Sequence, residues 1–478
     1  MDPSQYRPTP AKFVLEAEPS RLAGPKPKNE SPRLAVEKIA LTVAVVSAAA
    51  VAVRPGVGMA VVALFALTST LFSLGENTAT KRWCSLGLAL IPWLVIRDNS
   101  WLAISIVCTL ALVVGLTLFA GATNRSIWDL PLRSIFGRQA ASPAAEQSMG
   151  PDGAVLWRAL VGLLFAVPIV GVFYLLLASA DEVFARIIDL SSVPVVRIVL
   201  FLIVAPVATV LLGFGANGRS SSKPVLTQRF GSLESTIVLG AVATLFSAFI
   251  IIRFATIGRS LDDLGLRDEV RSGFFQLLWV AALTVVLVLA IREVSGGVVV
   301  DQTLRRAGLL VIALAAVIDG LALYRIWQYV DQSFLTQLRV WSFGFGVWLL
   351  VVLAFAACRL GGFRANSDWF TGALVTSWIA LMLVFAAMNT DVRIAEHNFA
   401  NPPTGVDEWI SVIPLMELSE DATPVIVENI DVLRPLPNDR YQRVVDHLCA
   451  TQPDSYPREF NFARRTATTS VQELCGLD

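Results

Sequence analysis

The chain has 478 residues, of which 55% are hydrophobic and only 16% are charged, and its mean hydropathy is +0.64. Soluble domains carry about 25% charged residues, so this chain has too few polar side chains to cover its apolar ones in water. The excess apolar surface must face lipid, which makes a lipid bilayer the first expected partner. The formal net charge of +0 gives no indication of a nucleic-acid partner.

The first 33 residues are rich in proline and in charged side chains, which predicts a disordered tail over 1–33. No secretory signal peptide is visible, so we expect the first apolar stretch to enter the membrane uncleaved. The basic residues are mostly arginine, with six lysines in the whole chain. This usage is typical of a GC-rich bacterial genome.

A helix needs roughly 20 apolar residues to cross the hydrocarbon core of a bilayer. Residues 34–390 contain about eleven such stretches, which predicts an all-α fold, a polytopic transmembrane helix bundle. The span at 83–96 is short and contains Pro92, and if it did not cross, every later connection would change side. The expected spans are 36–53, 57–75, 83–96, 101–121, 155–179, 193–214, 235–254, 273–291, 307–327, 341–358 and 370–388.

The connections indicate the orientation. With the N-terminus inside, the inner connections hold about twice as many basic residues as the outer ones, including all six lysines. This bias predicts a multi-pass protein of the cell membrane with a cytoplasmic N-terminus and an extracytoplasmic C-terminus. Segment 124–138 mixes apolar and basic residues and is expected along the inner surface, whereas 255–272 is expected to form a polar outer helix.

Residues 391–478 form the one sizeable region expected outside the bilayer. They contain seven arginines and fifteen acidic residues, and apolar residues recur at helical spacing. We expect several short helices docked on the outer face of the bundle, with room for an envelope protein as a partner. In an oxidising exterior Cys449 and Cys475 would form a disulfide, and the alternative is two free buried thiols.

Five short elements, in order along the chain, are similar to the pattern of one protein family. They are an Ala-Asp-x-x-Phe element, an Arg-x-Gly-Phe-Phe helix start, a Tyr-Val element ending in Leu-Thr-x-x-Arg, an Asn-x-Asp-x-x-Ile-Ala-x-x-Asn element and an aromatic-Asn-x-x-Arg closing element. A Leu-Ser-x-Asp-Ala-x-Pro run follows the fourth. The matching residues are Ala180, Asp181 and Phe184; Arg271, Gly273, Phe274, Phe275 and Leu277; Tyr329, Val330, Leu335, Thr336 and Arg339; Asn389, Asp391, Ile394, Ala395 and Asn398; 418–424; and Phe460, Asn461 and Arg464.

The family that these elements resemble is a group of uncharacterised bacterial multi-spanning membrane proteins, designated domain of unknown function 4153/4173. The resemblance runs from about residue 156 to residue 467. It implies a multi-spanning helical architecture. It brings no established activity, cofactor or substrate.

Charged residues within the spans are the first candidates for function, because each is costly in hydrocarbon. Asp319 lies well inside the ninth span, and Arg158 lies near the inner end of the fifth, where its long side chain can reach the interface. Asp319 could bind a proton or a cation. Alternatively, it pairs with an arginine or a helix-end hydroxyl as a structural lock, the interpretation that we favour at this stage.

Further charged residues are expected at the outer helix ends. They could form a ligand site at the membrane boundary, or act as helix caps and ion pairs that hold the C-terminal region. The second interpretation is favoured, because caps and ion pairs are common at helix ends. The candidates are Asp181, Glu182, Arg271, Arg325, Arg339 and Asp391.

Motifs of standard enzymes are missing from the sequence. Its two histidines, His397 and His447, both lie in the C-terminal region, so no pair of membrane histidines can ligate haem. We find no HExxH zinc site, no Walker A sequence and no Gly-x-Ser-x-Gly elbow. We therefore assign no catalytic, cofactor-binding or metal-binding residue and expect no hydrolase or kinase of standard type.

Three functions remain open. The first is an envelope-associated scaffold or sensor whose acidic C-terminal region binds a partner. The second is a secondary transporter using Asp319, which prolines within spans also favour, although no inverted repeat is readable. The third is a membrane-embedded transferase acting on a lipid-linked substrate, with Asp181 or Asp391 as an acid.

Overall fold

The computed structural model describes residues 55–73, 78–123, 151–188, 231–256, 273–295, 301–332, 334–363, 369–401, 413–434, 438–450 and 459–476. Several expected features lie outside these residues. They are the tail at 1–33, the spans at 36–53 and 193–214, the segment at 124–138, and the segment at 255–272 beyond its first two residues.

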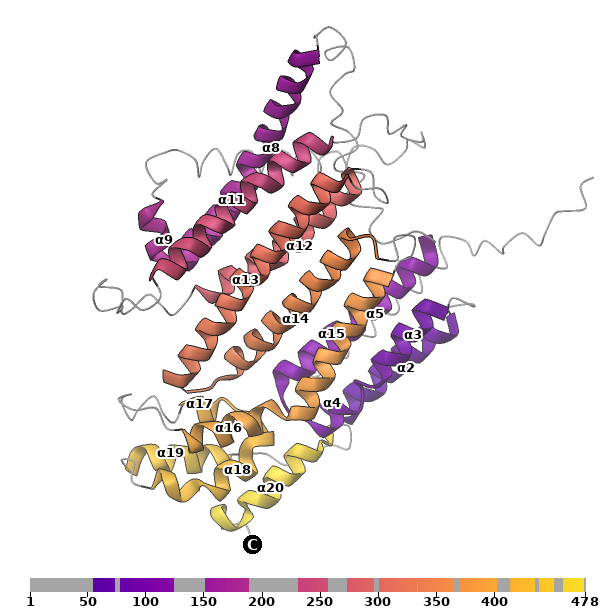
Figure 1. The fold of residues 1–478 in the computed structure, drawn as a ribbon. Coiled ribbons are helices and arrows are strands. Elements are labelled where there is room, and N and C mark those ends of the chain that lie inside the picture. The colour runs from indigo at the N-terminus through magenta and orange to yellow at the C-terminus, as the bar shows by residue number, and fades with distance from the viewer. Residues whose placement is uncertain are drawn as a thin grey trace, which may run out of the picture.

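Nearly all described residues lie in helices, and none of them lies in a strand (Figure 1). The first part of the chain forms the long apolar helices α2 (Val57–Ser73), α5 (Ser100–Thr123), α8 (Pro151–Ala180), α11 (Ser232–Thr256), α12 (Phe274–Val294), α13 (Gln302–Gln332), α14 (Gln337–Leu360) and α15 (Trp369–Met388). It also forms the shorter helices α3 (Thr78–Leu88), α4 (Trp93–Ile96) and α9 (Glu182–Ile187). The remainder, which we call the C-terminal domain, forms short helices: α16 (Thr390–Ala400), α17 (Ile413–Met416), η3 (Glu420–Ala422), α18 (Thr423–Glu428), η4 (Ile430–Leu433), α19 (Asn438–Cys449) and α20 (Phe462–Cys475).

Seven of the described helices are long and apolar enough to cross a membrane: α5, α8, α11, α12, α13, α14 and α15. They coincide with seven of the expected spans, so the prediction of a multi-pass helical membrane protein is confirmed. The segments at 57–68 and 82–96 are apolar but shorter. The total number of crossings depends partly on residues outside the described ranges.

The outward faces of the long helices carry large apolar side chains. Phe65, Ile104 and Ile251 are each more than 60% exposed. Soluble monomers rarely expose contiguous apolar surface on this scale. In the described part of the C-terminal domain, the exposed large apolar side chains are Val432 and Phe462. This contrast supports lipid around the long helices and water around the domain.

Charged side chains mark the two ends of the bundle. In α11 no charged residue lies between Glu234 and Arg253, and in α12 none lies between Phe274 and Arg292. At 1.5 Å per residue the rise from Glu234 to Arg253 is about 28 Å, close to the roughly 30 Å of a hydrocarbon core. We call the end near Arg253 the domain-side end, because the C-terminal domain lies there, and the other the far end (Figure 1).

The short span that contains Pro92 is a broken helix. Between α3 and α4 the chain makes three-residue turns, because proline has no N–H to continue the helical pattern. Trp83 lies against Gly372 of α15 near the far end. Fourteen residues later, Arg97 Nε donates to the Ala386 carbonyl at the domain-side end, at 3.1 Å. The broken helix therefore extends across the same depth of the bundle as residues 372–386 of α15.

Two groups of long helices enclose separate apolar cores, and the contact between α14 and α15 joins them (Figure 1). The larger group contains α8, α9, α11, α12, α13 and α14, with α13 packed against α11, α12 and α14. The smaller group contains α2 to α5 and most of α15. A third core lies inside the C-terminal domain.

A single residue turns the chain from the last membrane helix into the C-terminal domain. Asn389 has φ 51° and ψ 73° and is the one described non-glycine residue with positive φ. Asparagine tolerates this left-handed conformation better than most residues. Since α15 ends at Met388 and α16 begins at Thr390, no flexible linker separates the domain from the bundle.

A close backbone contact joins the end of α8 to the start of α12. A Cβ atom at Gly273 would lie 2.1 Å from the Ala180 carbonyl oxygen and 2.9 Å from its carbon. These are backbone atoms at the junction with Asp181, so they cannot move aside as a flexible side chain could. Only glycine permits this approach.

We predict that Gly273→Ala lowers the thermal midpoint of the detergent-solubilised protein, at a cost of about 2 kcal/mol or more, because the backbones must separate. The matched control is Gly240→Ala in α11, where an added Cβ meets nothing within 4 Å. Alanine favours the helix there, so the control should be neutral or slightly stabilising. Equal midpoints for the two variants would contradict the close contact.

Candidate functional site

Asp181 joins three helices at the domain-side end. Its carboxylate pairs with Arg325 of α13 and with Arg253 of α11, where Nη1 lies 3.2 Å from Oδ2. Arg325 also donates to the Ala180 carbonyl at 2.9 Å. The Asp181 side chain is only 4% exposed, so its charge needs these partners. The cluster ties the end of α8 to α11 and α13.

The local sequence explains the position of Asp181. Its extended backbone, with φ −147°, ends α8, and its carboxylate accepts the N–H of Phe184 at 3.1 Å. This is the usual role of aspartate at a helix N-cap. The Phe184 ring is fully buried and lies edge-on to Phe249 at 5.2 Å. The Ala-Asp-x-x-Phe element therefore supplies a turn, an ion pair and a core side chain.

Asp391, in the first turn of α16, links the C-terminal domain to two membrane helices. Its Oδ1 accepts from Asn99 Nδ2 and from Gln337 Nε2, both at 2.8 Å. Its Oδ2 accepts the N–H of Ser419 at 3.0 Å and the Ser419 hydroxyl. Asn99 also caps α5 by accepting the Leu102 N–H at 2.8 Å. One buried carboxylate thus connects the starts of α5, α14 and α16 with the segment before η3.

Asp421, in η3, binds the connection between α4 and α5. Its Oδ2 accepts the Asp98 N–H at 2.7 Å, and Arg97 Nη1 lies 3.4 Å from Oδ1. Ser419 Oγ lies between Asp421 and Asp391. Burial raises the pKa of the Asp421 carboxyl to about 6, although the Asp98 N–H and Arg97 act to lower it and Asp391 to raise it.

Asn461 and Arg464 fasten the last helix to the ends of α2 and α4. Asn461 caps α20 by accepting the Ala463 N–H, and its Nδ2 donates to the Arg97 carbonyl at 2.8 Å. The Arg464 guanidinium donates to Asp98 Oδ1 at 2.6 Å and to the Pro55 carbonyl at 3.1 Å. These contacts fix α20 against the beginning of the smaller helix group. Together with the contacts of Asp391 and Asp421, they form what we call the docking interface.

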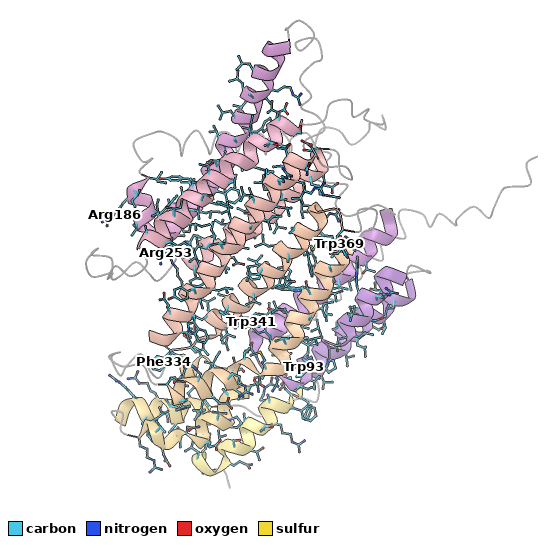
Figure 2. The ribbon with its side chains drawn as sticks, viewed as in Figure 1. Trp93, Arg186, Arg253, Phe334, Trp341 and Trp369 are labelled. Carbon is cyan, nitrogen blue, oxygen red and sulfur yellow. A yellow bond between two sulfur atoms is a disulfide. The ribbon has the colours of Figure 1, made fainter. Side chains whose placement is uncertain are left out.

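The connection between α13 and α14 also contacts the domain. Asn398 of α16 exchanges two hydrogen bonds with the Leu335 backbone, accepting from its N–H at 2.8 Å and donating to its carbonyl at 2.9 Å. Arg339 donates to the Phe334 carbonyl within the same connection. In Figure 2, Phe334 and Trp93 lie close to the domain, whereas Trp369 lies toward the far end.

The far end is held by ion pairs between helices. Arg158 Nε donates to Glu234 Oε1 at 2.7 Å, and its Nη2 lies 3.2 Å from Oε2. This two-point contact joins α8 to α11. Glu293 contacts Arg292 Nη1 at 2.6 Å and Arg359 Nη2 at 3.3 Å, which joins α12 to α14. Arg158 therefore has a carboxylate partner that its position in the sequence did not suggest.

Asp319 lies inside the larger helix group and is 0% exposed. Neither of its carboxylate oxygens has a hydrogen-bond partner among the described residues. The structural lock favoured from the sequence, a pairing with an arginine or a hydroxyl, is absent from the described part of the chain. Those same residues contain no group of three or more His, Cys, Asp or Glu that could hold a metal ion.

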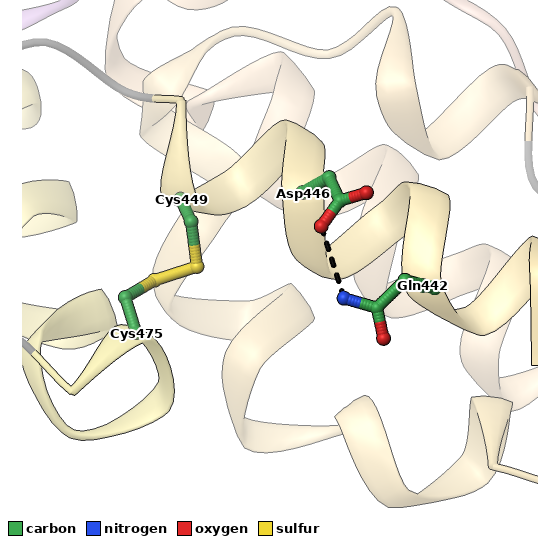
Figure 3. The surroundings of a disulfide bond; sticks show 4 residues. All are labelled: Gln442, Asp446, Cys449 and Cys475. Carbon is green, nitrogen blue, oxygen red and sulfur yellow. Dashed lines mark hydrogen bonds between the residues drawn. A yellow bond between two sulfur atoms is a disulfide. The ribbon is translucent and has the colours of Figure 1, made fainter.

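Cys449 at the end of α19 and Cys475 at the end of α20 are joined by a disulfide (Figure 3). The bond closes a separation of 26 residues. It links the last two helices of the domain, and α20 is also the helix that carries Arg464. Cys84, Cys108 and Cys358 are free.

The sequence matches the family described as Domain of unknown function (DUF4153) over residues 59–429. The chain belongs to this family. The match confirms the resemblance, begins about a hundred residues before residue 156, and ends before the closing element at 460–464. Neither a curated protein nor a solved structure matches the chain.

The elements that carry the family resemblance gather at the domain-side end. Ala180 and Gly273 make the close backbone contact there, and Asp181 makes the ion-pair cluster. Asn389 makes the turn into the domain, and Asp391 belongs to the docking interface. Much of this signature therefore describes how the bundle ends and how the domain is attached.

The structure separates the charged residues that were expected together at the outer helix ends. Asp181 and Arg325 lie in one cluster, and Asp391 lies in another with different partners. Arg339, in the first turn of α14, contacts the backbone just before that helix. Glu182 is the first residue of α9. Arg271 lies outside the described residues.

Several residues of the docking interface were not identified from the sequence. Three polar residues directly follow an apolar run: Arg97, Asp98 and Asn99. The sequence feature that could have indicated them is this polar triplet, whose last residue is of a type that caps helices. Asp421, which contacts Arg97 and Asp98, lies more than 300 residues later in the sequence. No local pattern can predict such a pairing.

We predict that Asp391→Asn destabilises the attachment of the domain by about 2–3 kcal/mol. The two carboxylate oxygens accept from four donor groups, and in the variant an NH₂ group replaces one of these oxygens and faces donors instead of accepting from them. The measurement is limited proteolysis of the C-terminal domain in detergent-solubilised protein. The matched control is Glu396→Gln, the same chemical change on α16 at an exposed ion pair with Arg393. Equal cleavage rates of the two variants would contradict a role of Asp391 in docking.

We predict a pH dependence from Asp421. Because its folded-state pKa is raised from 3.8 to about 6, the stabilising contribution is complete below a pH of about 4 and is lost as the pH rises through about 6. The protease resistance of the domain should fall across this window in the wild type, and Asp421→Asn should remove that part of the slope. The exposed Asp431→Asn, which alters a surface pair with Arg434, should keep the wild-type slope. Parallel profiles for all three proteins would refute this assignment.

Proposed function

We propose that this chain is a multi-pass protein of the cell envelope that acts as a scaffold or sensor through its C-terminal domain. The observation that carries the proposal is the docking interface, which joins the domain by buried polar contacts to the ends of several membrane helices. A domain attached in this way presents a surface in a fixed orientation to the bilayer.

The same contacts favour a sensor over a passive anchor. Asp391 is shared by Asn99 at the start of α5, Gln337 at the start of α14 and Ser419 within the domain. Buried hydrogen bonds to a charged group are costly to break. A partner that displaces the domain must therefore either pull on these helix ends or break the bonds.

The location of the domain outside the cytoplasm is part of the proposal. The disulfide between Cys449 and Cys475 supports it, because disulfides persist in oxidising compartments. The excess of basic residues on the other side of the expected spans supports the same orientation. An envelope protein that contacts the exposed face of the domain is the expected partner.

The two alternative functions have unequal support. The unpaired carboxyl of Asp319 favours a transporter. A transferase using Asp181 or Asp391 has less support, because the oxygens of both carboxylates already accept hydrogen bonds or ion pairs. A general acid needs a free position next to its substrate.

The proposed orientation predicts which cysteines a membrane-impermeant maleimide labels in intact cells. We expect Val432→Cys, at an exposed site of the domain, to be labelled without permeabilisation. The control, Arg306→Cys at the exposed far end of α13, should be labelled only after permeabilisation. Both substitutions are made in a chain that keeps the disulfide and has its three free cysteines replaced by alanine.

The same two positions test the proposed function. A photo-crosslinking amino acid at Val432 should give a discrete adduct with an envelope protein in intact cells, and the adduct should change when Asp391→Asn loosens the domain. The amino acid at Arg306 should not give that adduct. Labelling of Arg306→Cys instead of Val432→Cys in intact cells would overturn the orientation. Absence of a discrete adduct at Val432, with a correct orientation, would overturn the scaffold or sensor role.

A further inference from the structure

Asp319 is the one charged residue in the interior of α13, the helix that packs against α11, α12 and α14. The nearest charged residues along α13 are Arg325 on one side and Arg306 on the other. At 1.5 Å per residue, Asp319 lies about 9 Å inside Arg325 and about 20 Å from Arg306. Its carboxyl therefore lies within the depth of the bilayer, nearer the domain-side end.

The surroundings of Asp319 are apolar. Its neighbours on α13, Ala315, Ile318 and Ala322, are all 0% exposed and belong to the core of the larger helix group. One turn further along α13 lies Leu323. A Cβ atom added at Gly346 of α14 would meet the side chains of Leu323 and Leu278, so leucine side chains fill the space between the helices there. No water-exposed surface reaches the Asp319 carboxyl.

The charged groups on the surrounding helices lie at their ends. On the domain side, Arg253 of α11 and Arg325 of α13 both pair with Asp181, and Arg339 contacts the backbone before α14. On the far side, the charged residues of α11, α12 and α14 form ion pairs with one another or with α8. These are Glu234, Arg292, Glu293 and Arg359.

An ionised carboxylate without a partner is very costly in such a place, and the neutral acid is much less so. A metal cation would not resolve the cost, because it needs several oxygen ligands and the described residues place no group of three or more His, Cys, Asp or Glu there. A proton needs one oxygen only. We propose that Asp319 is an intramembrane proton-binding site, in which a neutral carboxylic acid is held in the core of the larger helix group.

Release of this proton requires a second arrangement of the helices. The carboxylate left behind must meet bulk water or a positively charged group, and in the arrangement described here Asp319 is 0% exposed and has no hydrogen-bond partner among the described residues. Proton binding therefore favours the packed arrangement of α13 over one in which water reaches Asp319. The site is independent of the proposed role of the C-terminal domain, since none of its residues belongs to the docking interface.

The test is infrared spectroscopy of the full-length protein in lipid, in which the aspartate residues carry a ¹³C-labelled side-chain carboxyl. We expect the wild type to show a carboxylic-acid C=O band at neutral pH that is absent from Asp319→Asn. Raising the pH should convert this band to carboxylate bands, and transfer to D₂O should shift it. The exposed Asp431→Asn should leave the band unchanged, because that side chain lies at the surface, where it pairs with Arg434.

Asp319→Glu provides a second variant if the asparagine variant does not fold. It should keep an acid band, but that band should lose the isotope shift of labelled aspartate. A wild-type spectrum with carboxylate bands and no acid band at neutral pH would overturn the proposal. An acid band that never exchanges with D₂O and never ionises would also overturn it, because such a group holds its proton permanently.

Discussion

Docking a domain onto the ends of membrane helices removes water from backbone groups that a helix end leaves without partners. The structure satisfies these groups with side chains of matching chemistry. Asn461 donates to the Arg97 carbonyl at the end of α4, and Arg97 donates to the Ala386 carbonyl near the end of α15. Because each donor must meet a particular carbonyl, the helix ends and the domain determine each other's positions. The turn at Asn389 and the short connection after α4 follow from this requirement.

Both ends of the bundle have ion pairs between helices, and the domain-side end adds hydrogen bonds to the docked domain. At the far end, carboxylates and guanidinium groups such as Glu234 and Arg158 pair across neighbouring helices. Such pairs fix which helices are adjacent, and they tolerate small changes in angle. At the domain-side end, Asp391 and Asn398 bind backbone and amide groups with stricter geometry. A signal that enters through the domain would therefore meet the more precisely fixed end.

The parts of the fold that depend on local composition could be predicted from the sequence. Seven long apolar helices lie where hydropathy places them, and the stretch that stood out as short and proline-containing is broken around Pro92. Pairings between distant residues could not be predicted. Arg158 has a long side chain that could reach the interface alone, yet it meets Glu234, 76 residues later. The charge of Asp319 is visible in its apolar run, but the absence of a partner depends on every helix around it.

The contacts of α20 set the order in which the molecule can be completed. Arg464 lies 409 residues after Pro55 and 366 residues after Asp98, both of which it contacts. The entrance to α2 and the junction before α5 therefore wait for a segment that the ribosome makes more than 360 residues later. Until then the first-made helices carry exposed polar ends, which a chaperone or protease can recognise. A chain truncated before α20 would thus leave the entrance to α2 and the junction before α5 unfinished, and closure of Cys449 with Cys475 would hold α20 in place once it has docked.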